Sequence, residues 1–148
     1  MTETAAMIRI VYASRATRDM PLPSVLGLLA KARTANKARG ITGALLYDKG
    51  IFLQVLEGPA RSVDATYTAI LGDKRHRDVQ VLLRESIQTR LFSDWSMGHA
   101  EASLEDLDNL PGLNGFFRSG RTVYDMGHPQ IEAIIAAFRK GAVLSAAE

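Results

Sequence analysis

Cysteine is absent from the 148 residues of this chain, and its absence excludes several kinds of chemistry at once. Without a thiol there is no disulfide, no thiolate metal ligand, no thiol nucleophile and no cysteinyl bond to a cofactor. Long apolar runs are also missing, since no stretch reaches the roughly 18 apolar residues of a transmembrane helix. The first residues, MTETAA, lack the basic start and apolar run of a secretory signal. We therefore expect a cytoplasmic protein without a membrane segment.

A strong charge of one sign is missing as well. The formal net charge is only +2, which disfavours the broad positive field of a general nucleic-acid-binding protein. The basic residues still form two acid-free clusters, one made of Lys31, Arg33, Lys37 and Arg39 and the other spanning residues 74–77. Each cluster could be a solvated helix end. Two clusters that meet at one site would instead suit an anionic ligand such as a diphosphate.

The length is typical of one domain, and the first half of the chain alternates between strand and helix patterns. Residues 7–13 are rich in β-branched and aromatic side chains and predict a strand. Residues 21–36 carry apolar side chains at helical spacing and are followed by Gly40, a helix stop signal. Residues 41–48 and 51–57 predict two strands of a hairpin that turns through Lys49-Gly50.

The next elements complete a recognisable order. Residues 62–71 predict a second helix, and residues 78–90 and 95–100 predict two more strands. The order βαββαββ predicts an α+β, ferredoxin-like sheet with both helices on one face. In that topology the first and third strands are neighbours in the middle of the sheet. We therefore expect Tyr12 and Gln54 to lie close together.

The remaining residues, 101–148, form a compositionally distinct C-terminal segment. Residues 104–110 are acidic and predict a turn or short helix, and a longer helix follows Pro129. That helix carries an apolar stripe, which consists of Ile131, Ile134, Ile135 and Phe138. Such a stripe must be buried, either on the open face of the sheet or against a second subunit. We expect a helical cap or relay after the main domain at residues 7–100, and a tail at residues 1–6.

Taken singly, the candidate functional residues have ordinary explanations. Gln54 could be a structural amide that joins two strands, but a buried glutamine can also act as a switch, since rotation of its amide exchanges donor and acceptor. Tyr12 could be a half-buried core residue, and Asn36 could cap the first helix. His76 has neither a nucleophile nor metal-ligand spacing nearby, so no metal site is expected.

Taken together, these residues resemble the BLUF family of blue-light sensors that use flavin. The resemblance rests on long, ordered motifs between about residue 7 and residue 100. The motifs are IVYAS at 10–14, GITG at 40–43, FLQVLEG at 52–58, DKRH at 73–76 and RLFSDWSMG at 90–98.

The resemblance implies a ferredoxin-like domain that holds a flavin without a covalent bond between its two helices. The flavin would be FAD, although FMN or riboflavin is possible. The implied flavin-binding residues are Arg33, Asn36, Ile41, Gln54, Ile70, Asp73, Arg75 and His76. Within this set, Asn36 would hold the pyrimidine side of the ring, and Asp73, Arg75 and His76 would lie near the ribityl chain and phosphates.

The family also implies a mechanism. Blue light would excite the flavin, Tyr12 would give up an electron and a proton, and Gln54 would be left rotated or tautomerised, which shifts the flavin spectrum to the red. Trp95 and Met97 occupy the positions that sense the glutamine. Because they alternate on one predicted strand, they point to opposite faces.

The chain departs from many relatives at three alanines. Ala32 and Ala35 replace Ser and Asn on the first helix, which removes a polar contact to the ring or its water. Ala69 replaces an Arg on the phosphate side.

These features favour a photoreceptor that is not an enzyme and that signals to a regulatory protein partner. Since no output domain fits after residue 100, we expect the segment from Pro129 to Gly141 to act as a relay or as the surface of a homo-oligomer. The alternatives are a flavin-dependent enzyme, for which no acid-base pair is present, and a light-insensitive interaction module with the same fold.

Overall fold

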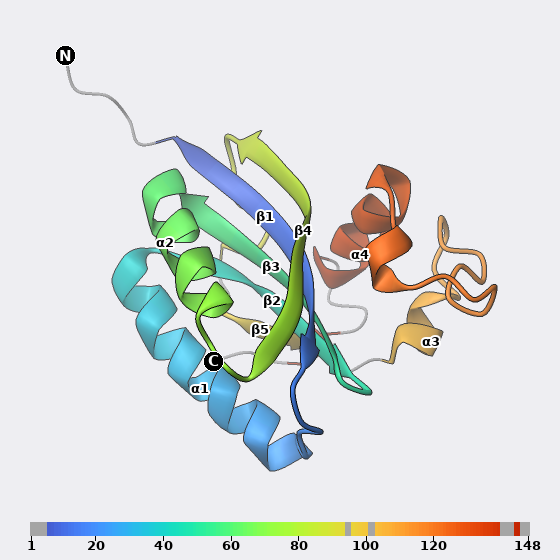
Figure 1. The fold of residues 1–148 in the computed structure, drawn as a ribbon. Helices are drawn as coiled ribbons and strands as arrows, with labels where there is room; N and C mark the ends of the chain where they lie inside the picture. The colour runs from blue at the N-terminus through green and yellow to red at the C-terminus, as the bar shows by residue number, and fades with distance from the viewer. Residues whose placement is uncertain (1–5, 94–95, 101–102, 140–143, 146–148) are drawn as a thin grey trace.

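The structure, a computed structural model, describes residues 6–93, 96–100, 103–139 and 144–145. The predicted order βαββαββ is confirmed (Figure 1). It comprises β1 (Met7–Ala16), α1 (Leu22–Arg39), β2 (Thr42–Asp48), β3 (Ile51–Pro59), α2 (Ala60–Leu71), β4 (His76–Ile87) and β5 (Gly98–Ala100). The C-terminal segment adds α3 (Leu104–Leu107), a 3₁₀ helix (Val123–Asp125), α4 (His128–Arg139) and β6 (Leu144–Ser145).

The strands of the described residues form one sheet in the order β4-β1-β3-β2-β5-β6. Strands β1 and β3 are antiparallel neighbours in the middle, and their register places Tyr12 directly opposite Gln54. The predicted closeness of these two residues is therefore present. Strand β2 continues the antiparallel ladder, whereas the short β5 joins β2 in parallel.

Helix α1 is longer than the sequence pattern indicates. It ends at Arg39, and Gly40 adopts the left-handed conformation (φ 71°) that closes it. The predicted stop at Gly40 is correct, but Asn36 lies inside the helix and is not its cap. The hairpin also turns as predicted, since Lys49 and Gly50 both have positive φ, at 48° and 82°.

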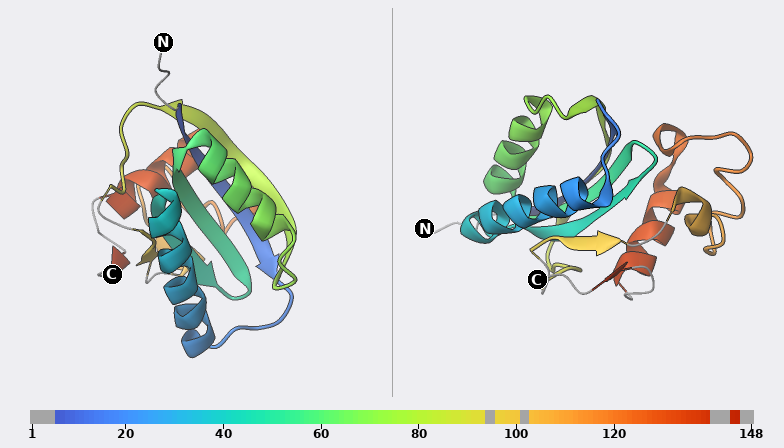
Figure 2. Two further views of the ribbon diagram at one scale, coloured as in Figure 1. Left: turned by 90° about the vertical axis from the view of Figure 1, so that its left-hand side faces the viewer. Right: turned by 90° about the horizontal axis from the view of Figure 1, so that it is seen from below.

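The sheet is covered on both faces, and the two layers come from different parts of the chain. Helices α1 and α2 lie on one face, while α4 and α3 lie on the other (Figures 1 and 2). The apolar stripe of α4 is buried in a cluster with Val11, Leu53 and Val55 of the central strands. Of the two predicted burial sites for this stripe, the structure therefore shows the open face of the sheet. The stripe itself is not a free surface for oligomer contacts.

Element bounds differ at the edges of the sheet. Strand β4 begins at His76 and ends at Ile87, so it lies about two residues earlier than the prediction for 78–90. Strand β5 covers only Gly98–Ala100 of the predicted 95–100, and Trp95 lies outside the described residues. Strand β6, which pairs with β5, was not predicted because two residues are too few for a recognisable pattern.

Candidate functional site

A cavity of about 290 Å³ opens between α1, α2 and the sheet. Apolar side chains line much of it, including Leu28, Leu45, Leu56 and Ile70. The polar lining residues are Tyr12, Lys31, Asn36, Arg39, Gln54, Thr66, Asp73, Arg75 and His76. Small side chains at positions 32, 35 and 69, all alanine, complete the wall. Such an enclosure suits a flat, largely apolar ligand with a polar edge and an anionic tail.

A chain of hydrogen bonds connects Tyr12, Gln54 and Met97. Tyr12 and Gln54 both point toward the helices, because alternate residues of β1 and β3 face this layer. The Tyr12 hydroxyl donates to Gln54 Oε1, and Gln54 Nε2 donates to Met97 Sδ at 3.3 Å. Tyr12 and Met97 are buried, and Gln54 is 7 % exposed. The amide of Gln54 is thus held between a hydroxyl donor and a sulfur acceptor.

The Tyr12 hydroxyl keeps its proton firmly in this site. Burial raises the pKa of Tyr12, and the charges of Asp73 and Tyr67 add to the rise. The ring packs edge-on against Tyr67, with 5.9 Å between the ring centroids. Because the hydroxyl remains protonated at neutral pH, it serves as a donor to Gln54, and the phenol is a source of one proton and one electron.

Two polar residues of α1 hold the segment that carries Met97. Asn36 Nδ2 donates to the Ser96 carbonyl at 2.8 Å, and Arg33 Nε donates to the Met97 carbonyl at 2.9 Å. Asn36 is buried and lines the cavity, whereas Arg33 does not line it. The residues just before β5 are therefore attached to the same helix that forms one wall of the cavity.

A second group of polar lining residues lies at the loop between α2 and β4 and at the start of β4. Asp73 accepts hydrogen bonds from the backbone and guanidinium of Arg75, which lowers the pKa of Asp73 to about 2. His76 Nδ1 lies 2.8 Å from Ser14 Oγ. Burial lowers the pKa of His76, so its imidazole is neutral at pH 7.

The sequence-predicted binding residues fall into three groups. Asn36, Gln54, Ile70, Asp73, Arg75 and His76 line the cavity together. Arg33 and Ile41 do not: Arg33 binds the Met97 carbonyl, and Ile41 is buried in the core with Tyr12. Trp95 lies outside the described residues, so only Met97 can be placed, and it contacts Gln54.

Sequence reasoning missed some lining residues. Thr66 faces the cavity and its hydroxyl accepts a hydrogen bond from Arg39 at 3.1 Å. Spacing could have indicated Thr66, since it precedes Ile70 by four residues and so shares its helix face. Lys31 and Arg39 of the first basic cluster line the cavity, as do Arg75 and His76 of the second, so parts of both clusters meet at one site.

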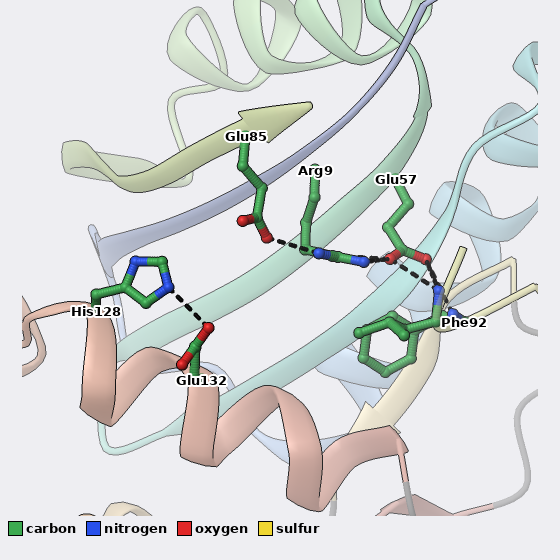
Figure 3. A network of polar contacts seen from close by, with 7 residues as sticks. Arg9, Glu57, Glu85, Phe92, His128 and Glu132 are labelled. Carbon is green, nitrogen blue, oxygen red and sulfur yellow. Dashed lines mark hydrogen bonds and ion pairs between the residues drawn. The ribbon is translucent and has the colours of Figure 1, made fainter. Parts of the chain in front are cut away.

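A buried ion-pair network on the opposite face of the sheet was not anticipated (Figure 3). Arg9 lies between two carboxylates, at 2.8 Å from Glu57 and 2.6 Å from Glu85. Glu57, which is fully buried, also accepts hydrogen bonds from the backbone N–H groups of Leu91 and Phe92. The network thus fixes the start of the segment between β4 and β5, upstream of Met97. The hydrogen bond between His128 and Glu132 in the same view is a separate one within α4.

The residues present fit a flavin. The apolar walls suit the isoalloxazine ring, the amides of Asn36 and Gln54 can bind its polar edge, and Lys31 and Arg75 can bind phosphate. Among the described residues no three His, Asp or Glu side chains gather in a way that could hold a metal ion. In the same part of the chain, no helix has the length and apolar character to cross a membrane.

Comparison with known proteins agrees with this site. The profile of the BLUF family, described as sensors of blue-light using FAD, matches residues 7–98. The chain is 34% identical over 113 residues to photoactivated adenylate cyclase subunit beta of Euglena gracilis, covering 76% of this chain and 13% of that protein. It is 28% identical over 117 residues to the blue light- and temperature-regulated antirepressor BluF of Escherichia coli strain K12, covering 79% of this chain and 28% of the relative.

Solved structures extend the likeness over nearly the whole chain. The dark-state structure of BlrB, a BLUF protein, has a TM-score of 0.76 at 27% identity and covers 93% of this chain and 98% of that one. A bacterial light-regulated adenylyl cyclase has a TM-score of 0.64 at 29% identity and covers 91% of this chain but 40% of its own. The chain spans 13% or less of the Euglena cyclase subunits that it matches.

Proposed function

Because the chain belongs to the BLUF family of flavin-based blue-light sensors, we propose that its response to light is carried by Tyr12, Gln54 and Met97. In this proposal the Tyr12 phenol gives up an electron and a proton under blue light. Their return leaves the Gln54 amide rearranged, and an effector protein reads the change by contact. The protein acts as a photosensor and not as an enzyme.

The observation that carries the proposal is the position of Gln54. Its carbonyl oxygen accepts from Tyr12, its amide nitrogen donates to Met97, and its side chain also lines the cavity. Rotation of the amide would present nitrogen to the phenol and oxygen to the sulfur. Because Met97 has no hydrogen to donate through sulfur, the rearranged amide must find other partners, and the contact to the segment before β5 changes.

The bound flavin, FAD in this proposal, would supply absorption of blue light and an acceptor for the electron. The chain supplies the rest. Asn36 and Gln54 would orient the polar edge of the ring, Ile70 would pack on it, and Lys31 with Arg75 would bind the phosphates, since all five residues line the cavity. Tyr12 is buried, and its hydroxyl donates to Gln54 Oε1, which places the phenolic proton next to the amide.

Substitution at Gln54 tests the proposal. Purified Gln54→Leu protein should bind flavin but lose the reversible red shift, because a leucine has no hydrogen bonds to exchange. Tyr12→Phe should also lose it, because no phenolic proton is available. Gln130→Leu is a matched control, since Gln130 caps α4 on the other face of the sheet and should leave the shift intact.

The outcome separates the proposal from the alternatives. A full red shift in Gln54→Leu would contradict the role of the amide. Loss of stability alone, with a normal shift in the protein that remains folded, would make Gln54 a structural residue. Light-driven bleaching without a red shift would favour a flavin-dependent enzyme.

A further inference from the structure

Arg39, the last residue of α1, lines the cavity, but the proposed function gives it no role. Its Nη1 atom donates a hydrogen bond to the hydroxyl of Thr66 on α2 at 3.1 Å, and Thr66 is buried. In the described part of the chain, no carboxylate forms an ion pair with Arg39, whereas the other lining arginine, Arg75, is paired with Asp73. Arg39 is therefore a positive charge that is fixed in place but not neutralised by a carboxylate of the described residues.

Strand β3 shows where the two ends of the cavity lie. Its alternate residues Phe52, Gln54 and Leu56 all line the cavity, so they mark successive positions along it. The Phe52 ring packs against His76, with 4.6 Å between the ring centroids, so this end adjoins the loop that carries Arg75. Because each strand residue adds about 3.3 Å, Leu56 lies about 13 Å further along.

Arg39 lies at the end that Leu56 marks. Helix α1 ends there beside the end of β3, since the Gly40 carbonyl oxygen would be only 2.7 Å from a Cβ atom built on Gly58. Gly40 directly follows Arg39, and Gly58 comes shortly after Leu56. The two arginines that line the cavity are thus at opposite ends, and Gln54 lies between them.

This order assigns the two arginines to different parts of a ligand. In the proposed function the phosphates bind near Arg75 and Gln54 binds the polar edge of the ring, so Arg39 lies beyond Gln54, at the ring. A guanidinium has five N–H donors and no acceptor, so it can bind a ring carbonyl oxygen there. Its charge also favours negative charge that the ring takes up, and a site shielded from water strengthens this attraction.

We propose that Arg39, held in position by Thr66, binds a carbonyl oxygen of the flavin ring and stabilises the ring after it accepts an electron. The inference rests on the proposed function, in which Tyr12 supplies that electron and a proton. Arg39 contacts the ligand and keeps its own protons throughout, whereas Thr66 is a positioning residue that acts through Arg39.

Equilibrium titrations of the flavin-free protein with lumiflavin, riboflavin and FMN test the assignment, because lumiflavin contains the ring without a ribityl chain or a phosphate. Arg39→Gln should weaken the binding of all three by the same factor, about tenfold, since one charge-assisted hydrogen bond is lost. Arg75→Gln, at the other end, should weaken FMN more than the other two. Lys37→Gln is the matched control, because Lys37 is exposed on the same helix and does not line the cavity.

Reduced riboflavin provides a readout that a purely structural role would not move. Its ring carries more negative charge than that of oxidised riboflavin, so anaerobic calorimetry should show that Arg39→Gln weakens the reduced form by the larger factor. Thr66→Val, which removes the hydroxyl at similar volume, should have the same effect at a smaller size, and Thr66→Ser should restore wild-type affinity. These two variants provide the test if Arg39→Gln does not fold.

Three outcomes would overturn the inference. Arg39→Gln could weaken FMN alone, which would put the phosphate at Arg39. It could leave all affinities unchanged, or it could weaken the oxidised and reduced forms equally, which would make Arg39 only a link between α1 and α2. If no flavin binds to the wild-type protein, the proposed function itself fails. Wild-type binding with a reversible red shift, together with any of the three outcomes, rejects only the role of Arg39.

Discussion

At the scale of single residues, the site depends on one amide with two unlike partners. Gln54 accepts a hydrogen bond from Tyr12 on the neighbouring strand and donates one to Met97, which lies next to β5. The Met97 sulfur can only accept, so it favours the orientation that gives it the amide nitrogen, whereas the Tyr12 hydroxyl can donate or accept. The orientation of Gln54 is therefore determined by its neighbours, and a change at either one should alter it.

Replacing the sulfur acceptor should weaken this preference. Met97→Leu conserves volume, so the fold should lose at most about 1.5 kcal/mol. The Gln54 amide nitrogen would lose its partner, and part of the population should adopt the rotated amide already in the dark. We expect a smaller light-minus-dark difference spectrum per bound flavin. Met126→Leu is the matched control, because Met126 is buried in the α4 layer away from the cavity. A full-sized difference spectrum in Met97→Leu would contradict the account.

His76 should make stability depend on pH. Burial holds the pKa of folded His76 below its ordinary value of 6.5, so the unfolded chain takes up the proton first as the pH falls. The free energy of unfolding should therefore decrease as the pH falls through 6.5, the ordinary pKa that His76 has in the unfolded chain. Thermal denaturation of His76→Gln should show a flatter dependence. The exposed His128 serves as control, and a His128→Gln profile flatter than that of His76→Gln would count against this cause.

Individual residues were predictable to different degrees. Tyr12 and Gln54 could be paired from the sequence because strand order alone brings them together. The pairing of Arg9 with Glu57 could not be predicted, because their burial depends on Glu85 of β4 and on a segment that has no periodic pattern. Arg33 was expected to bind the ligand, but its guanidinium donates a hydrogen bond to the Met97 carbonyl. Spacing along a helix does not determine which cation of a cluster reaches a cavity.

At the scale of elements, the segment between β4 and β5 is held at both ends. Glu57 binds the backbone at Leu91 and Phe92, and α1 binds the backbone at Ser96 and Met97. Phe92 is buried in the α4 layer. This segment therefore connects the residue that contacts Gln54 with the layer on the opposite face of the sheet.

Weakening the buried anchor should destabilise the domain. Glu57→Gln would leave Arg9 with one carboxylate and would lose charge-assisted bonds to the backbone, at a cost of about 3–5 kcal/mol. Glu85→Gln removes the outer, one-third exposed partner of the same arginine and should cost about 1 kcal/mol or less. Chemical denaturation of both variants measures the difference. Equal losses would show that Glu57 does not anchor the segment.

Element order was more predictable than element ends. The strand and helix periods indicated βαββαββ, and Gly40 marked the end of α1 correctly. The predicted end of β4 and the predicted length of β5 were less accurate, because pairing with neighbouring strands, and not the local sequence pattern, decides where these strands end. The stripe on α4 showed that a face must be buried, but only the tertiary structure shows that the sheet buries it.

At the scale of the whole molecule, the sheet separates two layers with different roles. The layer of α1 and α2 forms the cavity that Tyr12 and Gln54 line. The apolar cluster of α4 covers the other face of the sheet, and Figure 2 shows α4 on that face. In the proposed function, the signal would pass between the layers at β5, which begins directly after Met97 and lies between β2 and β6 in the sheet. The apolar stripe of α4 can contact an effector only if α4 leaves the sheet. An effector that binds while α4 is packed on the sheet must use other surfaces.

The absorption spectrum of the purified protein, recorded in the dark, under blue light and during return to the dark, tests the central claim most directly. The account predicts a yellow protein whose flavin bands shift reversibly to the red without bleaching. A colourless protein that does not take up added flavin would contradict it, as would a bound flavin whose spectrum does not respond to blue light.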